Sequence, residues 1–279
     1  MILPDDFVFT QSNLQDYLDC PYRFYLRHIR HTRWPALVVD DAVAFEERGQ
    51  IGARFHRLLQ QYLLEVPETR LTDLASADPS PDVLNWWQDF LINVPPWLDG
   101  TRWVEATLHA QLAGFHLAAK YDLVLAQPPD GLVIFDWKTS KKRPRKEWLL
   151  NRVQTRIYRF ILCKSGSALL KNATVEPEQI TMQYWYAAFP TAPISLPYDA
   201  RAYEKDQAFF TRLVNEIGSR KADSFFRTEE TRHCRFCVYR SHCDRGTQAG
   251  DLAAFEDEEL ENETDLQDLD FEAIEEIEF

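Results

Sequence analysis

Residues 115–138, FHLAAKYDLVLAQPPDGLVIFDWK, decide the fold of this chain. Apolar and polar residues alternate over 115–126 and again over 132–138, and this period of two predicts two strands. Between them, residues 128–131 (PPDG) have the composition of a tight turn, so we expect a hairpin. The same period over 102–112 predicts a third strand just before it.

Two acids and a lysine lie on this predicted hairpin. Asp122 and Asp136 stand at similar distances on either side of the turn, which places their carboxylates nearly opposite each other on neighbouring strands. Two carboxylates that lie so near each other must share a proton or a cation. Mg²⁺ and Mn²⁺ prefer such oxygen-rich sites. Lys138 shares a strand face with Asp136, about 7 Å along the strand, where an ammonium can orient or deprotonate a water. A surface cluster of ion pairs at a strand end remains the alternative, since short motifs often match by chance.

The sequence on either side of the hairpin is mainly helical. Apolar residues recur at helical spacing, with Ser12 as a candidate cap for the first helix. Helices are expected at 12–30, 43–65, 82–93, 146–164 and 199–220, with a loop over 67–81 and a further strand near 180–188. This order indicates a mixed α/β body with a helical N-terminal portion.

Three polar residues on the predicted helices carry little information alone. His56 lies beside the apolar stripe of the helix at 43–65, where a packed histidine is more common than a metal ligand. Gln154 and Tyr158 are four residues apart on one face of the helix at 146–164, a spacing that is also typical of a polar helix edge.

Three cysteines form a C-x2-C-x5-C pattern near the end of the body: Cys234, Cys237 and Cys243. This is the spacing of metal ligands, and a fourth ligand must come from elsewhere, with Cys20 as the candidate. Cys163 belongs to an apolar helix and is expected in the core. Four thiolates suit either zinc or an iron–sulfur cluster, and the neighbouring His233 and His242 keep a zinc site open.

The net charge of −13 is concentrated at one end of the chain. Residues 251–279 contain fourteen Asp and Glu and no Lys or Arg, which leaves 30 acids against 31 Lys and Arg in the rest. The body at 1–250 is therefore not electrostatically excluded from nucleic acid, and the tail is a separate unit. The tail is expected to be disordered, to mimic nucleic acid in a basic channel, or to dock a partner through its interspersed apolar residues.

The sequence gives no sign of a membrane or secreted protein. No stretch approaches the roughly 18 apolar residues that span a bilayer, and residues 1–9 contain acids where a signal peptide has a basic patch and an apolar run. We therefore expect a cytoplasmic protein whose five cysteines are thiols or metal ligands rather than disulfides.

Taken together, these residues resemble the RecB-like nucleases of the PD-(D/E)XK superfamily. The likeness is to the iron–sulfur branch, which includes the CRISPR-associated adaptation nuclease and the AddB nuclease domain. The matching pieces occur in the family's order: the helix with Cys20-Pro21, the segment from Gly52 to Leu59 with its histidine, Asp122, Asp136-Trp137-Lys138-Thr139, Gln154 with Tyr158, and the closing cysteine triplet. The sequence departs from the family at Ala119, where a glycine is usual.

The resemblance implies a restriction-endonuclease-like fold, a mixed β-sheet flanked by helices, with a C-terminal cysteine-cluster segment. It implies a metal-dependent DNA nuclease that works in recombination, repair or CRISPR adaptation. We expect its substrate to be single-stranded DNA. The expected partners are DNA and a helicase or another DNA-processing protein. A catalytically weak DNA-binding or assembly protein that uses the same fold as a scaffold remains the alternative.

The resemblance also assigns roles to single residues. The implied ligands of Mg²⁺ or Mn²⁺ are His56, Asp122, Asp136 and the backbone carbonyl of Trp137. The implied catalytic residues are Asp122, Asp136, Lys138, Gln154 and Tyr158. The implied DNA contacts are Gln154, Tyr158, Arg152, Arg156, Lys141 and Lys142. The implied ligands of a 4Fe–4S cluster, with zinc as the alternative, are Cys20, Cys234, Cys237 and Cys243.

Overall fold

The computed structural model describes these parts of the chain: residues 2–4, 6–33, 40–127, 131–170, 174–235 and 237–246. Most of the predicted turn, residues 128–130, and the acidic tail at 251–279 lie outside the described residues. The division of the chain at residue 250 therefore stays a prediction. None of the described helices is long and apolar enough to cross a membrane.

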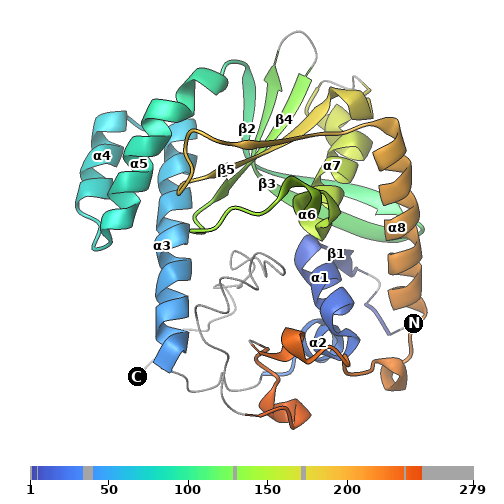
Figure 1. Ribbon diagram of the computed structural model, residues 1–279. Helices are drawn as coiled ribbons and strands as arrows, with labels where there is room; N and C mark the ends of the chain where they lie inside the picture. The colour runs from blue at the N-terminus through green and yellow to red at the C-terminus, as the bar shows by residue number, and fades with distance from the viewer. Residues whose placement is uncertain are drawn as a thin grey trace.

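Six strands of the described chain form one mixed sheet (Figure 1). They are β1 (Val8–Phe9), β2 (Thr101–Leu112), β3 (Phe115–Gln127), β4 (Gly131–Lys138), β5 (Ile180–Tyr186) and β6 (Ile194–Pro197). The strand order is β1-β3-β4-β5-β6, and β2 also pairs with β3. The β4–β5 pair is parallel, whereas β2–β3, β3–β4 and β5–β6 are antiparallel. The four long strands confirm the prediction, while the short β1 and β6 were not predicted.

Helices cover both faces of this sheet. They are α1 (Gln11–Asp19), α2 (Pro21–Phe24), α3 (Asp40–Leu63), α4 (Glu68–Ser76), α5 (Pro81–Asn93), α6 (Lys146–Asn151), α7 (Val153–Ser165) and α8 (Ala200–Ser219). One apolar core packs α1, α7 and α8 against one face, and a second core packs α3, α4 and α5 against the other. Figure 1 shows α3 to α5 on one side of the sheet, α7 and α8 on the other, and α2 beside the orange C-terminal segment. The predicted α/β fold, a mixed β-sheet flanked by helices, is confirmed.

The predicted helix at 12–30 is interrupted at Cys20. Cys20 is extended, with φ −161° and ψ 105°, because proline disfavours helical backbone in the residue before it and Pro21 follows. The cap of α1 is Thr10 rather than Ser12: its hydroxyl accepts from the Asn13 N–H, and the Asn13 side chain accepts from the Thr10 N–H. The break turns Cys20 out of the helix and toward the C-terminal segment.

Two further predictions need correction. The predicted loop at 67–81 contains α4, which the cluster of turn-forming residues concealed; Leu71 and Ala75, one turn apart, are buried against α5. The predicted helix at 146–164 is two helices, because Arg152 is extended with ψ 142°. This break places Gln154 in the first turn of α7.

Halfway along β2 and β3, the alternation of their side chains reverses. Positions of the same parity face one core before this point and the other core after it. In β3, odd-numbered residues face the α7 core before this point and the α3 core after it: Leu117, Ala119 and Tyr121, then Leu123 and Leu125. At the exchange the β2–β3 ladder skips one pair, in which Glu105 stands opposite Asp122. Glu105 has a left-handed backbone, with φ 52°. This distortion frees Asp122 from the regular alternation of β3.

We expect Glu105→Gly to leave the free energy of unfolding unchanged or to raise it by up to about 1 kcal/mol. A left-handed backbone costs a non-glycine residue about 1–2 kcal/mol, and the ion pair of Glu105 with the exposed Lys120 contributes little. The matched control, Thr107→Gly on the same strand, should lose about 1 kcal/mol through strand entropy. Denaturant unfolding measures both variants, and equal losses would show that Glu105 is not strained.

Candidate active site

The cluster at the C-terminal end of β4 joins Asp136, Lys138 and Gln154. Lys138 Nζ lies 3.0 Å from Asp136 Oδ2, so the two side chains share a strand face as predicted. The Gln154 amide bridges them: its Nε2 donates to Asp136 Oδ1 at 2.9 Å, and its Oε1 accepts from Lys138 Nζ at 3.3 Å. Asp136 is buried and the Lys138 side chain is only 12% exposed. Little water therefore screens this ion pair.

Asp122 lies one step beyond the last β3–β4 pair, in a register that would bring it opposite Asp136. Its carboxylate takes the place of the next ladder bond and accepts from the Trp137 N–H at 2.9 Å. The same carboxylate lies 3.7 Å from His56 Nδ1, which belongs to α3. Asp122 therefore contacts both the backbone of β4 and a helix on the α3 side of the sheet.

The neighbouring charges shift the pKa values of this pair. Burial lowers the pKa of His56, but the carboxylates of Asp122 and Asp136 outweigh burial and raise it overall. Burial raises the pKa of Asp122, but His56 and the Trp137 N–H outweigh it and the pKa is lowered. Asp122 is therefore held as a carboxylate beside a histidine that readily carries a proton.

The close approach of α3 to the end of β4 depends on Gly52. A Cβ atom at Gly52 would lie 3.0 Å from the Thr139 Oγ1, a contact tighter than nine in ten real Cβ contacts. His56 is one turn further along α3 and on the same helix face. The absence of a side chain at Gly52 therefore allows the imidazole to reach Asp122.

Tyr158 lies on α7, four residues after Gln154, and Arg152 lies at the break between α6 and α7. Tyr158 is buried with its ring centroid 5.0 Å from that of Tyr121, whose hydroxyl donates to the Tyr158 carbonyl. Arg152 is also buried, with its guanidinium 4.5 Å from the centroid of the Trp148 ring. Both residues thus help to pack the start of α7.

The other three predicted DNA contacts differ in their surroundings. Arg156 Nε donates to the buried Asp206 at 2.6 Å, and its guanidinium lies 3.9 Å from the Phe209 ring centroid. This ion pair engages the Arg156 guanidinium, which we expected to contact a DNA phosphate. Lys141 is exposed and Lys142 half-buried, in the loop between β4 and α6. Of the two loop lysines, Lys141 is the more exposed.

The sequence profile of the PD-(D/E)XK nuclease superfamily matches residues 8–244, which include the six described strands. The match also includes the acidic cluster, our name for Asp136, Lys138 and Gln154 together with Asp122 and His56. The chain belongs to this superfamily. Membership implies a nuclease that hydrolyses phosphodiester bonds, and the mixed sheet between helices is the restriction-endonuclease-like fold.

Two solved structures resemble the fold of this PD-(D/E)XK protein. One, described as "Crystal structure of SSO0001", is 12% identical, with a TM-score of 0.40 over 87% of this chain and 88% of that chain. The other, described as a "Putative exonuclease" from Eubacterium rectale, is 8% identical, with a TM-score of 0.48 over 76% of this chain and 80% of that chain. No curated protein matches the chain.

Among the residues that the structure describes, no group of three or more His, Cys, Asp and Glu side chains is placed to hold a metal ion. In the acidic cluster, Asp136 instead pairs with Lys138, and Asp122 with His56. The metal sites that the sequence led us to expect in this nuclease therefore remain proposals.

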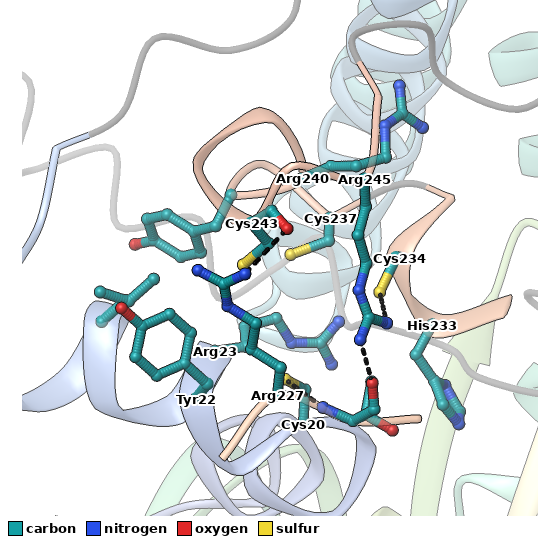
Figure 2. A pocket seen from close by; sticks show the side chains of 13 residues that line it. Cys20, Tyr22, Arg23, Arg227, His233, Cys234, Cys237, Arg240, Cys243 and Arg245 are labelled. Atoms are coloured by element: carbon teal, nitrogen blue, oxygen red, sulfur yellow. Dashed lines mark hydrogen bonds between the residues drawn. The ribbon is translucent and has the colours of Figure 1, made fainter. Parts of the chain in front are cut away.

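The four predicted cluster cysteines line one pocket: Cys20, Cys234, Cys237 and Cys243 (Figure 2). The first follows α1, and the others lie in or beside two short 3₁₀ helices, Thr231–Cys234 and Ser241–Cys243. The Thr228 N–H donates to the Cys20 sulfur at 3.5 Å, and Arg245 donates to the Cys234 sulfur at 3.1 Å. Cys163 is elsewhere, packed against the α7 core as predicted.

Four arginines line the same pocket: Arg23, Arg227, Arg240 and Arg245. Arg23 is fixed by two buried carboxylates, with its Nε 2.8 Å from Asp16 and its Nη2 paired with Asp19. Burial raises the pKa of Asp16, but Arg23 and its neighbours outweigh burial and hold it far below its usual range. His233 also lines the pocket, 3.8 Å from Asp19, whereas His242 stacks on Tyr22.

Two residues next to the acidic cluster were not singled out from the sequence. The Tyr184 hydroxyl on β5 donates to Gln154 Oε1 at 3.5 Å and lies 2.8 Å from the Thr155 hydroxyl. Both residues are fully buried. The β4–β5 register, in which Tyr184 is the partner of Asp136, is the signal that reveals Tyr184, and it requires the pairing of strands that are distant in sequence.

Proposed function

We propose that this protein is a metal-dependent deoxyribonuclease of the RecB-like branch that cuts single-stranded DNA. The observation that carries the proposal is the buried cluster of Asp136, Lys138 and Gln154 beside Asp122 and His56. A buried ion pair is weak support for stability, because apolar residues of similar volume often stabilise as well or better. Paired groups with shifted pKa values are instead typical of active sites.

The donor set of this cluster fits Mg²⁺ or Mn²⁺. Asp122, Asp136 and the carbonyl of Trp137 offer the oxygen ligands that these ions prefer, and His56 adds a nitrogen. When bound, such an ion acidifies a water and offsets charge on the scissile phosphate. Asp122 and Asp136 stand on adjacent strands, one step beyond the last β3–β4 pair, so both carboxylates belong to the same end of these strands.

The remaining residues of the cluster act on water and DNA. Lys138, held between Asp136 and Gln154, positions or deprotonates the attacking water. Gln154 and Tyr158 hold the strand near the scissile bond, and Arg152, Lys141 and Lys142 contact its phosphates. For Arg156 to join them, its ion pair with Asp206 must open.

The lining of the cysteine pocket supports a 4Fe–4S cluster as its occupant. Four thiolates would give the cluster a net negative charge, and the four arginines that line the pocket would offset this charge. When bound, the cluster supplies a covalent link between the N-terminal helices and the C-terminal segment. The chain already joins these segments through the Tyr22 N–H, which donates to the Phe226 carbonyl at 3.0 Å. Zinc is the alternative occupant of the same thiols.

We expect Lys138→Ala to reduce cleavage of a single-stranded oligonucleotide by about 10²-fold or more, as when a group that transfers a proton or stabilises charge is lost. DNA affinity should stay nearly unchanged, because other residues provide the phosphate contacts. Initial rates with Mg²⁺ or Mn²⁺ and binding by fluorescence anisotropy measure the two effects. Cleavage of the matched duplex at the same rate would reject the single-strand preference. A wild-type protein that binds DNA without cleaving it would favour the alternative, a DNA-binding or assembly protein that uses the fold as a scaffold.

A further inference from the structure

The Gln154 amide can work in the cluster in one orientation only. Its nitrogen donates to the Asp136 carboxylate, and its oxygen accepts from the Lys138 ammonium. In the reversed orientation, the amide oxygen would face a carboxylate and the amide N–H₂ would face an ammonium, and neither contact is a hydrogen bond. The amide orientation therefore determines where the Lys138 nitrogen is held.

Tyr184 and Thr155 form a buried relay behind this amide. The Tyr184 hydroxyl has a single proton, which it directs to Gln154 Oε1. When this proton points to Gln154, the Thr155 hydroxyl, 2.8 Å from the Tyr184 oxygen, is the donor in that pair. Tyr184 is fully buried, lies opposite Asp136 in the β4–β5 ladder, and has its ring centroid 5.9 Å from Lys138 Nζ. The packed ring fixes the hydroxyl oxygen between Gln154 Oε1 and the Thr155 hydroxyl.

The bond from Tyr184 to Gln154 is long in the free protein. At 3.5 Å it exceeds the usual O–H···O distance of about 2.7–2.8 Å. Hydrogen bonds of active sites often tighten only when substrate is bound. An interaction that strengthens on the way to the transition state raises kcat rather than substrate affinity.

We propose that Tyr184 is a positioning residue for the cleavage step. Its hydroxyl, oriented by Thr155, holds the Gln154 amide in the orientation that presents Lys138 to the reacting phosphate. The inference rests on the proposed nuclease function, and it adds to that function a group that touches neither metal nor DNA.

The test compares Tyr184→Phe with Tyr17→Phe in steady-state cleavage of a single-stranded oligonucleotide with Mn²⁺. Tyr17 is a matched control, a buried tyrosine whose hydroxyl donates to Glu216 at 2.5 Å, outside the acidic cluster. Tyr184→Phe should lower kcat about tenfold, which corresponds to about 1.4 kcal/mol, with KM within twofold of wild type. Tyr17→Phe should leave both constants unchanged.

A double-mutant cycle shows whether Tyr184 acts through Gln154. In a Gln154→Ala background, Tyr184→Phe should have no further effect, because the group that it orients is gone. Thr155→Val should lower kcat in the same direction as Tyr184→Phe, and it provides a second variant should Tyr184→Phe fold poorly. Unchanged kcat in both, or losses that multiply in the double variant, would overturn the inference. A wild-type protein that cleaves no substrate would overturn the nuclease proposal and this inference together.

Discussion

Asp136→Asn will reduce metal-dependent cleavage by roughly 10³-fold or more, the largest loss expected from any single change in the cluster. The change removes the negative charge that pairs with Lys138 and that would ligate the metal, while an amide oxygen remains to accept from Gln154. Asparagine is preferable to alanine here. Asp136→Ala would remove from a buried site both the ion pair with Lys138 and the acceptor of the Gln154 amide, and this would destabilise the fold.

The same assay includes Asp78→Asn as a control. Asp78 pairs with Arg54 at 2.7 Å at the end of α4, outside the acidic cluster, and its loss should leave cleavage at the wild-type rate. Thermal unfolding of all three proteins verifies that they are folded. Cleavage by Asp136→Asn at the rate of the control would reject the assigned site.

Protein purified without oxygen will be brown and contain about four irons per chain. Cys237→Ser will abolish the colour and lower the thermal midpoint by on the order of 10 °C, since binding energy at a structural metal site is folding energy. The loss should be large because the pocket joins Cys20, at the end of α1, to a C-terminal segment whose own regular structure consists of short 3₁₀ helices. Iron analysis, visible absorbance and thermal unfolding measure these effects.

Cys163→Ser provides the matched control for the cluster. Cys163 is half-buried on α7, its thiol donates to the Val175 carbonyl at 3.5 Å, and burial raises its pKa to about 11. This variant should keep its colour and its iron. One zinc per chain and no iron in anaerobic protein would contradict the cluster, while the nuclease proposal would stand on the acidic site alone.

Much of the sheet and of the β4 site could be predicted from the sequence. Side chains of a strand point to alternate faces, so the alternation over 132–138 was enough to place Asp136 and Lys138 together. The break after Cys20 was also encoded locally, since it depends only on the proline that follows. The helix α4 was missed because its short apolar repeat lies among turn-forming residues.

Only the tertiary structure decided which groups the site residues contact. Arg156 looked available for phosphate, but Asp206, fifty residues further along the chain, pairs with it. Asp122 looked like a regular strand residue, but the exchange of faces in β3 turns it to His56. Local sequence sets backbone conformation through sterics and hydrogen bonds with near neighbours. The partner of a buried charge is set by the packing of distant segments, which no short stretch of sequence specifies.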